Sequence, residues 1–507
     1  MNSETGEKTL VLEALAQRPY LSPDGKYAVY YSTEDQNWWS IDLQNRENIK
    51  LTHELDVHFF DEENDTPSLP RPYGFGGFTK DGKALVFDEF DVWELELSGI
   101  ENPQKLTDGR IEYKQFRTLR LDRENRNLAS YFQDQLLLTS FGKYNKKQAL
   151  FGLNVNEEIN VLITEDDHSL IGFQKAKEAE RLIYRKQDFQ HYSDVFLFNL
   201  TENDVQITNV NPQQDEFLWG SVELVKWNAY DGTELQGLLY KPENFDESKK
   251  YPMITYFYEK RSDNLHNYIS PQPSASIVNM SYLVSNGYLV FVPDIVYQEG
   301  KPGASAENCI LSGVEAMEKL PYVNSEKLAI QGQSWGGYQV AHLITKTDKF
   351  AAAGSGAPVS NMTSAYGGIR WASGLSRQFQ YERTQSRIGT TLWDDVDLYL
   401  ENSPLFGVPN ITTPVLIMHN DDDGAVPYYQ GIEFFMGLRR LQKPAWLLVY
   451  NNEAHNLRKM KNKQDLSIRM MQFFDHYLKD EPQPVWMKKG LPRTKKGKDL
   501  GYDLIEE

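Results

Sequence analysis

Residues 328–338 read Leu-Ala-Ile-Gln-Gly-Gln-Ser-Trp-Gly-Gly-Tyr, and this stretch decides the fold. Its apolar start predicts a buried strand, and the residues after Ser334 predict a helix. A Gly-x-Ser-x-Gly motif stands between the two. A serine on a sharp turn from strand to helix needs small neighbours, because the backbone must fold back on itself. The pattern therefore predicts a serine hydroxyl that projects from the sheet, near the positive end of a helix.

Predicted strands and helices alternate on both sides of this motif. The strands are expected at residues 222–227, 235–240, 253–258, 288–293, 328–332, 351–355, 415–419 and 446–450. The helices are expected near residues 305–319, 336–346, 428–441 and 464–478. Such alternation indicates a mainly parallel sheet covered on both faces. With the serine turn, it predicts an α/β-hydrolase domain over residues 221–485. Residues 486–507 are expected to be a solvated polar C-terminal tail.

Serine is a weak nucleophile and needs a base, which this fold supplies in the chain order Ser, Asp or Glu, His. His455 lies on a loop just past the strand at 446–450 and is the predicted base for Ser334. The acids at 421–423 lie just past the strand at 415–419, and one of them would orient the imidazole. Taken alone, these three aspartates could also be turn-forming or hold a hard cation. His419 ends a buried strand, which favours a core histidine.

The first part of the chain contains a loose repeat. Its units close on an aliphatic residue followed by threonine, at Leu51-Thr52, Leu106-Thr107, Ile163-Thr164 and Ile207-Thr208, which are 55, 57 and 44 residues apart. Several short strands per unit at this period predict a β-propeller of about four blades over residues 1–220. A β-sandwich with coincidental spacing is the alternative. Four is the lower limit of the usual range of about four to eight blades, and the chain begins almost directly on a blade strand. We therefore expect either that several N-terminal blades of a longer ancestor are missing or that the ring is incomplete and closed by a partner.

Charge is distributed unevenly along the 507 residues. The net charge is −19, of which −16 falls on residues 1–220 and −3 on the remainder. This balance argues against nucleic acid as a partner, because binding to its backbone needs clustered Lys and Arg. The acidic first part is either a solvated surface or a field that sorts substrates by charge.

Several classes of protein are excluded or disfavoured by absent patterns. No apolar run reaches the length of a membrane span, and the polar N-terminus is not a signal peptide, so we expect a cytoplasmic protein. A periplasmic or secreted location is expected if the chain is an N-terminally truncated form. Cys309 is the single cysteine, which rules out an intrachain disulfide. Without a phosphate loop or a Cys/His cluster, neither a cofactor nor a metal is indicated.

Three segments resemble the prolyl oligopeptidase family of serine peptidases, closest to its dipeptidyl-peptidase and acylaminoacyl-peptidase branches. They are residues 332–338, residues 419–427 and residues 453–455. The resemblance implies an N-terminal propeller before the hydrolase domain. It also implies that the catalytic acid is Asp423, because the family places this residue four positions after the histidine that ends the strand.

The same resemblance implies further site residues. The oxyanion hole would be formed by the backbone N–H of Trp335 and a tyrosine hydroxyl, which maps to Tyr258, with Tyr256 as the alternative. In the family an insertion after the serine helix shapes the S1 pocket, which makes Trp371, Phe379 and Tyr381 candidate substrate contacts. Aromatic packing is an equally good interpretation of these three.

Other positions depart from the dipeptidyl-peptidase branch or stay open. Glu-Lys-Arg at 259–261 replaces a small turn, and Ala425 replaces an asparagine. The acidic run at 61–63 is an untested candidate for binding a free N-terminus. Arg383 and Arg387 would anchor a substrate carbonyl or pair with surface acids.

The sequence predicts a serine peptidase that hydrolyses short peptides through an acyl-enzyme. An esterase of small acyl esters on the same triad is the first alternative. The second is an inactive, propeller-based binding protein.

Overall fold

The computed structural model describes residues 5–6, 8–13, 15–154, 159–199 and 204–505. Parts of the predicted N-terminal segment and of the C-terminal tail, at 1–4, 7 and 506–507, lie outside these ranges. The chain divides into two compact units. Unit 1 comprises Met1–Asn64, Leu69–Asn211 and His266–Tyr268, and unit 2 comprises Asp65–Ser68, Pro212–Leu265 and Ile269–Glu507. The main division thus falls at residue 211, close to the predicted boundary at 220.

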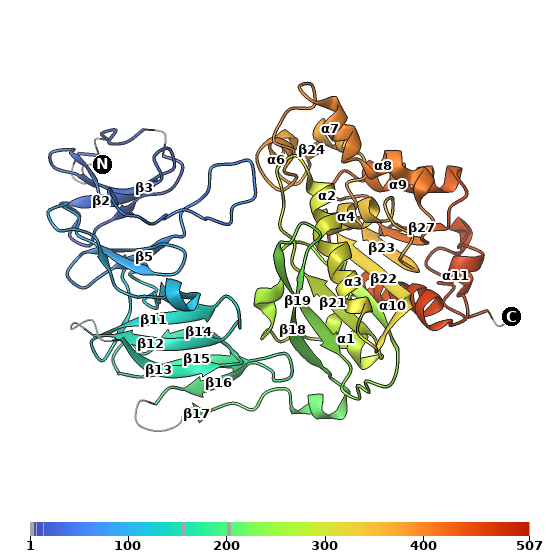
Figure 1. Cartoon of the computed structure of the whole chain (residues 1–507), viewed down its shortest axis with the longest axis horizontal. Coiled ribbons are helices and arrows are strands. Elements are labelled where there is room, and N and C mark those ends of the chain that lie inside the picture. Colours follow the sequence, from blue (N-terminus) through green and yellow to red (C-terminus); the bar gives the residue numbers. More distant parts are fainter. Residues whose placement is uncertain (1–4, 7, 14, 155–158, 200–203, 506–507) are drawn as a thin grey trace. The chain divides into compact units, whose positions relative to one another are not determined.

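Unit 1 is built from four small antiparallel sheets that follow one another along the chain (Figure 1). The first two contain β1 (Tyr20–Leu21), β2 (Tyr27–Ser32), β3 (Asn37–Asp42) and β4 (Asn48–Lys50), then β5 (Phe75–Phe78), β6 (Ala84–Phe87), β7 (Val92–Leu95) and β8 (Gln104–Lys105). The third contains β9 (Lys114–Thr118), β10 (Tyr131–Phe132), β11 (Gln135–Gly142), β12 (Gln148–Leu153) and β13 (Ile159–Asp166). The fourth contains β14 (Ser169–Lys175), β15 (Leu182–Gln187), β16 (Asp194–Leu197) and β17 (Val205–Gln206). The prediction of an all-β first part is confirmed, although the described residues of this unit do not show a closed propeller ring.

Consecutive sheets of unit 1 pack face to face through apolar side chains. Trp38 of the first sheet shares a buried cluster with Phe78 of the second. Leu85 of the second sheet lies in a cluster with Leu138 of the third, and Leu137 of the third lies in a cluster with Leu182 of the fourth. Neighbouring residues of one strand point to opposite faces, so each inner sheet contributes to two clusters.

The repeated threonine has a structural role in three of the four sheets. Its hydroxyl accepts the N–H of a residue at the start of the third strand, at 2.9–3.0 Å, in the pairs Thr52–Trp38, Thr107–Val92 and Thr208–Val195. It also donates to an Asx side chain at the same strand end, at 2.6–2.9 Å, in the pairs Thr52–Asn37, Thr107–Asp91 and Thr208–Asp194. The sequence repeat is therefore a repeated hydrogen-bond motif that satisfies a backbone donor.

Unit 2 contains one eight-stranded sheet in the order β18-β19-β21-β20-β22-β23-β26-β27. Its strands are β18 (Ser221–Asn228), β19 (Glu234–Lys241), β20 (Tyr251–Tyr256), β21 (Leu289–Pro293), β22 (Val323–Gln333), β23 (Ala352–Gly356), β26 (Val415–Met418) and β27 (Ala445–Leu448). The first three in this order pair antiparallel and the remainder pair parallel. All eight strands coincide with predicted ones, which confirms the α/β architecture of the second part.

Helices and short turns connect these strands. The helices are α1 (Met280–Ser285), α2 (Pro302–Ala306), α3 (Ser312–Glu318), α4 (Trp335–Leu343), α5 (Met362–Tyr366), α6 (Gln378–Glu382), α7 (Val396–Glu401), α8 (Pro404–Gly407), α9 (Tyr429–Arg440), α10 (Met460–Lys479) and α11 (Val485–Lys488). The single turns are η1 (Arg110–Glu112), η2 (Pro212–Glu216), η3 (Ser262–Asn264), η4 (Glu307–Leu311), η5 (Val408–Asn410) and η6 (Arg493–Lys495), and β24 (Ile369–Arg370) pairs with β25 (Leu375–Ser376). No helix in the described ranges is long and apolar enough to cross a membrane.

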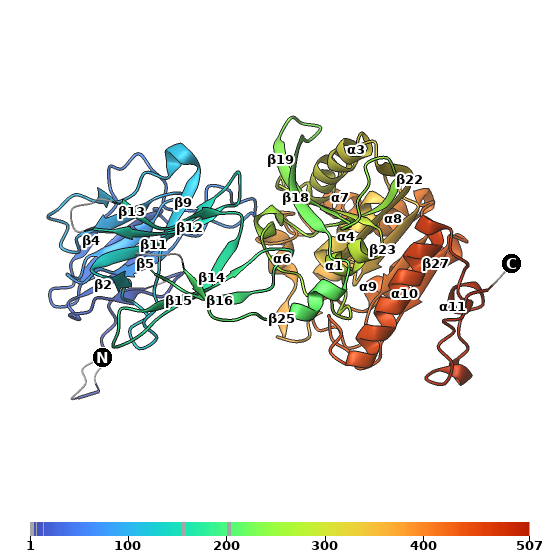
Figure 2. The ribbon, with the colours of Figure 1, turned by 90° about the horizontal axis from the view of Figure 1, so that it is seen from below.

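The central sheet of unit 2 is covered on both faces (Figure 2). Ile330 of β22 lies in one buried cluster with side chains of α3 and α4. The next residue, Gln331, points to the other face, where Gly354 lies against Phe474 of α10. A parallel sheet buried on both faces explains why its strands read as nearly continuous apolar runs.

The C-terminal segment differs from the solvated tail that its composition suggests. Trp486 of α11 is buried, and its indole N–H donates to Gln472 of α10 at 2.8 Å. The Tyr502 hydroxyl donates to Asp465 of the same helix at 2.5 Å. The segment therefore packs on α10 as part of unit 2. Burial of the Trp486 indole and the Tyr502 hydrogen bond hold it there, although lysines surround them in the sequence.

We expect Trp486→Ala to lower the free energy of unfolding of unit 2 by about 3–5 kcal/mol, the range for truncating a buried aromatic side chain. Trp371→Ala is the control, because that indole is 73% exposed. Urea denaturation followed by circular dichroism measures both variants. Equal midpoints for the two would contradict the packed tail.

Candidate active site

Ser334 lies at the turn between β22 and α4 in a strained backbone conformation. Its φ of 62° and ψ of −115° fall outside the regions that side chains favour. The Ser334 N–H donates to the Gly356 carbonyl on β23 at 2.8 Å, which fixes the turn to the end of the sheet. The predicted strand–serine–helix turn is thus present, and it is held by a neighbouring strand.

The glycines of the motif are required by close backbone contacts. A Cβ on Gly332 would collide with the backbone of Gly336, the second residue of α4. A Cβ on Gly336 would lie 2.7 Å from the Phe257 carbonyl oxygen. Both positions are closed to any larger residue, so the spacing of the motif follows from sterics.

His455 lies on the loop after β27, and three side chains hold that loop. The Gln333 amide donates to the His455 carbonyl at 3.0 Å, and the Asn420 amide donates to the Ala454 carbonyl at 2.6 Å. The buried Glu453 carboxylate accepts the N–H groups of Arg458 and Lys459 at 2.8 and 3.1 Å. These contacts fix the backbone on both sides of the imidazole.

Asp423 is buried and hydrogen-bonded to His455. Its Oδ2 lies 2.7 Å from His455 Nδ1, and its Oδ1 accepts the N–H groups of Ala425 and Val426 at 2.8 and 2.9 Å. Burial alone would raise the pKa of this carboxyl. Hydrogen bonds from His419 and His455 outweigh burial and hold the pKa of Asp423 well below its usual value.

The three adjacent aspartates have different environments. Asp421 accepts the Asn452 N–H at 2.8 Å and the Asn451 amide at 2.5 Å, which closes the turn after β27. Asp422 is exposed. The three form no group that could hold a metal ion, as far as the chain is described. Of these three aspartates, Asp423 is the one hydrogen-bonded to His455. It is therefore the candidate for the acid that comes between Ser334 and His455 in the chain.

His419 is fully buried, as its place at the end of β26 suggests. Its Nε2 lies 3.2 Å from the Val426 carbonyl and 3.4 Å from Asp423 Oδ2. It therefore lies near the same carboxylate oxygen as His455, and it does not line the cavity that contains Ser334.

One cavity of about 280 Å³ brings the predicted site residues together. Ser334, Trp335, Tyr258 and His455 all line it. Ser334 Oγ and His455 are not hydrogen-bonded in this structure, although both face the same space. The Trp335 N–H is the first of α4 and has no acceptor within the helix. The Tyr258 hydroxyl accepts the Gln385 amide at 2.8 Å, which orients it at the cavity wall.

Tyr256 is the alternative to Tyr258 for the oxyanion hole. It ends β20, is 4% exposed and is not part of the cavity lining. The geometry therefore favours Tyr258, two residues beyond the strand end.

The three aromatic residues predicted as substrate contacts lie outside the cavity lining. Trp371 and Phe379 are 73% and 40% exposed. Tyr381 is buried and packs against Tyr366 and Tyr399. The packing interpretation fits Tyr381, and substrate contact by the other two stays a prediction.

The excursion after α5 supplies polar residues to the cavity instead. No sequence motif marks these residues, which are Arg370, Arg377, Gln380, Gln385 and Ser386. Of the two arginines that sequence analysis did consider, Arg383 is exposed. Arg387 is buried and pairs with Asp65 at 2.7 Å and Glu259 at 3.4 Å. Its guanidinium also stacks on Tyr297, whose hydroxyl accepts the Trp335 indole N–H at 3.0 Å.

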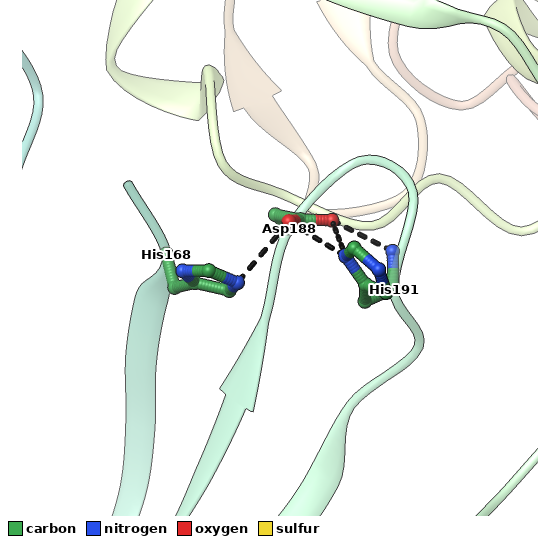
Figure 3. A group of neighbouring side chains, drawn as sticks. All are labelled: His168, Asp188 and His191. Atoms are coloured by element: carbon green, nitrogen blue, oxygen red, sulfur yellow. Dashed lines mark hydrogen bonds and ion pairs between the residues drawn. The ribbon is translucent and has the colours of Figure 1, made fainter. Parts of the chain in front are cut away.

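A group in unit 1 could hold a metal ion, and sequence analysis did not find it (Figure 3). His168 Nε2 and His191 Nδ1 lie 3.3 and 2.9 Å from Asp188 Oδ2. His168 Nδ1 faces Asp166 at 3.0 Å, an arrangement that also orients metal-bound imidazoles. The residues come from two separate loops, after β13 and after β15, so their spacing carries no metal signature. Without an ion, the same contacts are hydrogen bonds that connect the two loops. Ser334 lies in the other unit, so this group is not part of the cavity described above.

Residues 273–481 match the model of the prolyl oligopeptidase family. An uncharacterized peptidase of Bacillus subtilis, YuxL, is 24% identical over 280 residues, which cover 52% of this chain and 40% of that protein. Dipeptidyl-peptidase 5 of Porphyromonas gingivalis is 23% identical over 327 residues, which cover 58% of this chain and 43% of that protein. The chain thus spans less than half the length of these curated relatives.

A puromycin-hydrolyzing peptidase of Mycobacterium tuberculosis has a similar solved structure. The TM-score is 0.63 at 15% identity, and the alignment covers 91% of this chain and 69% of that one. Identity this low supports the likeness of the fold alone.

We expect Gly332→Ala to destabilise unit 2 by about 3 kcal/mol, because the added methyl group overlaps the backbone of α4. Gly367→Ala is the matched control, since its φ is −72° and its added methyl group would lie 3.8 Å from the nearest atom. Thermal unfolding measures both. A melting temperature of Gly332→Ala equal to that of the control would overturn the steric account of the motif.

Asp423 predicts a specific pH dependence of stability. Its folded-state pKa lies below the unfolded value of about 3.8, so its contribution is present above that pH and is lost as pH falls through the folded pKa. We expect Asp423→Asn to lose about 1.5–3 kcal/mol at pH 7, and we expect this loss to shrink below about pH 4. Asp422→Asn should show a difference near zero throughout. Urea denaturation between pH 3 and pH 7 measures both, and a loss that is independent of pH would refute the assignment.

Proposed function

We propose that unit 2 is a serine peptidase of the prolyl oligopeptidase family, whose model residues 273–481 match, and that it hydrolyses short peptides through an acyl-enzyme at Ser334. One observation carries the proposal. Ser334 and His455 line the same cavity, and His455 Nδ1 is hydrogen-bonded to the buried Asp423 at 2.7 Å.

In the proposed reaction, His455 is the general base. Its Nδ1 carries the proton that Asp423 accepts, which leaves the Nε2 lone pair free for the Ser334 hydroxyl. As Nε2 takes that proton, Ser334 Oγ forms a bond to the carbonyl carbon of the substrate, and the carbonyl π electrons move to its oxygen. The Asp423 carboxylate stabilises the imidazolium that results.

The developing oxyanion needs donors that already point to it. We assign the Trp335 N–H and the Tyr258 hydroxyl to this role, because both line the cavity beside Ser334. The Gln385 amide donates to Tyr258, so the phenol hydrogen is left to point into the cavity. Preorganised donors of this kind stabilise the transition state more than the substrate.

Breakdown of the tetrahedral species completes the first half of the reaction. His455 returns its proton to the leaving nitrogen, the C–N bond breaks and an ester to Ser334 remains. Water then repeats the sequence with His455 as base, which releases the acid product and restores the serine.

We also propose that unit 1 is a partial, propeller-like array of blades. Its four sheets stack in chain order through shared apolar clusters, as successive blades of a propeller do.

A small-ester esterase would use the same triad. Turnover of chromogenic esters without cleavage of any peptide in a library would identify it.

We expect a fluorophosphonate probe to label the parent protein and to leave Ser334→Ala unlabelled, since the probe reacts with an activated serine hydroxyl. Gel fluorescence after labelling measures this, with heat-denatured protein as background. An unlabelled but folded parent protein would contradict the proposed nucleophile and would favour the inactive, binding-protein alternative.

Tyr258→Phe tests the oxyanion donor. We expect kcat to fall by about 100-fold with a small change in KM, because the lost hydrogen bond forms only in the transition state. Tyr256→Phe is the control and should stay within about 3-fold of the parent, because this tyrosine does not line the cavity. The reverse ranking of the two variants would assign the role to Tyr256.

A further inference from the structure

The cavity beside Ser334 carries two arginines that the proposed reaction does not use. Arg370 ends β24 and Arg377 follows β25, so one two-stranded hairpin delivers both. Both side chains line the same 280 Å³ space as Ser334 and His455. A guanidinium pair next to a nucleophile has consequences for what that space can accept.

Arg377 is fixed in place and only partly satisfied. It is 2% exposed, and its Nη1 donates to the Ala425 carbonyl. Its Nε is buried without a hydrogen-bond partner. A buried donor that lacks an acceptor costs free energy unless a bound group completes it.

Arg370 is half-buried beside it. Its Nη1 donates to the Gln380 amide oxygen at 3.1 Å, which is a neutral partner. Burial and the positive charge of Arg377 lower the pKa of Arg370, and the negative charge of Asp423 partly opposes them. The two guanidinium groups therefore repel one another within the cavity.

Neither arginine forms an ion pair with a carboxylate in the described chain. The contrast with the other buried arginines is direct. Arg387 pairs with Asp65 and Glu259, and Arg469 pairs with Asp465 at 2.8 Å. Asp423, whose charge acts on Arg370, already accepts hydrogen bonds from a histidine and two backbone N–H groups.

Burying a charge without a counter-ion is expensive, so a protein rarely keeps one where nothing binds. A guanidinium offers a planar fork of donors that matches a carboxylate in two parallel hydrogen bonds. The missing partner of Arg370 and Arg377 is thus an anion, and its place is next to the atom that attacks the substrate.

We propose that this cavity binds an acidic side chain, that of a glutamate or aspartate, on the substrate residue whose carbonyl Ser334 attacks. The proposal rests on the peptidase function above and specifies its substrate class. Arg377 supplies the fixed charge, and Arg370 supplies a second, more adjustable one. Val359 and Val426 line the same cavity and offer apolar contact for the methylene groups of the side chain.

A carboxylate could also come from the C-terminus of a peptide. The first set of substrates therefore carries no free C-terminus. Blocked and unblocked tripeptides with a fluorogenic amide leaving group, ending in Glu, Asp, Gln or Ala, isolate the side chain. A second set of peptides, ending in Ala with a free or an amidated C-terminus, isolates the terminal carboxylate.

We expect kcat/KM for Glu to exceed that for its uncharged isostere Gln by about 10-fold or more. The Glu-to-Gln ratio should fall toward one in Arg377→Met and in Arg370→Gln. Arg383→Gln is the matched control, because it removes one positive charge from the exposed surface of the same excursion. Its ratio should equal that of the parent.

Arg377→Met could fail to fold, since the side chain is buried. Arg370 is only half-buried, so Arg370→Gln is expected to fold and keeps the test valid. Fluorophosphonate labelling reports whether each variant retains a reactive serine. Equal rates for Glu and Gln in the parent protein would overturn the proposal. So would a preference for Glu that persists in both arginine variants, or a preference that follows the free C-terminus alone.

Binding to Ser334→Ala separates this proposal from the peptidase function. We expect blocked, amidated peptides ending in Glu to bind this variant about 10-fold more tightly than those ending in Gln, by isothermal calorimetry. This readout needs no turnover. Selective binding without any cleavage by the parent would remove the peptidase function and keep the anion site, whereas cleavage without selectivity would do the opposite.

Discussion

The candidate site depends on how closely α4 approaches the ends of β22 and β23. The backbone of Ser334 adopts a positive φ because glycine at 332 and at 336 lets the first turn of the helix lie against the strand. The apolar cluster that joins the sheet to α3 and α4 keeps the helix in that position. Strain at one residue is thus maintained by the packing of a whole domain, and the serine hydroxyl is directed out of the sheet as a result.

The second constraint is that each buried charged side chain needs partners, and these partners differ from one residue to the next. Asp423 is surrounded by donors from two imidazoles and two backbone N–H groups, so its charge persists without solvent. Arg387 and Arg469 have carboxylate partners. The Arg377 side chain donates to one carbonyl, and its Nε has no hydrogen-bond partner among the described residues; in the proposal above, the substrate supplies the anion. Specificity in this proposal arises from a charge that the fold leaves uncompensated.

The sequence predicted those features that local pattern determines. The eight strands of unit 2 were predictable because a sheet buried on both faces leaves long apolar runs. The positions of Ser334 and His455 just past the ends of β22 and β27 were predictable from the apolar runs that precede them, whereas their catalytic roles stay a proposal. Asp423 could not be chosen from its neighbours by composition, because all three follow the same strand and only burial separates them. The role of Arg377 depends on the Ala425 carbonyl, 48 positions away, and no local signal contains that contact.

The segment Asp65–Ser68 bears on how this protein could be divided or recombined. These four residues lie between β4 and β5 in the sequence, yet they belong to unit 2, where Asp65 is the closer counter-ion of the buried Arg387. Arg387 in turn stacks on Tyr297, whose hydroxyl accepts the indole N–H of Trp335, the residue after Ser334. A gene fragment that began at Pro212 would encode the whole sheet and every triad candidate but not that carboxylate. Unit 2 is therefore not encoded by one continuous stretch of the chain, and a fusion of residues 212–507 to another N-terminal domain would lack the Asp65 partner of Arg387.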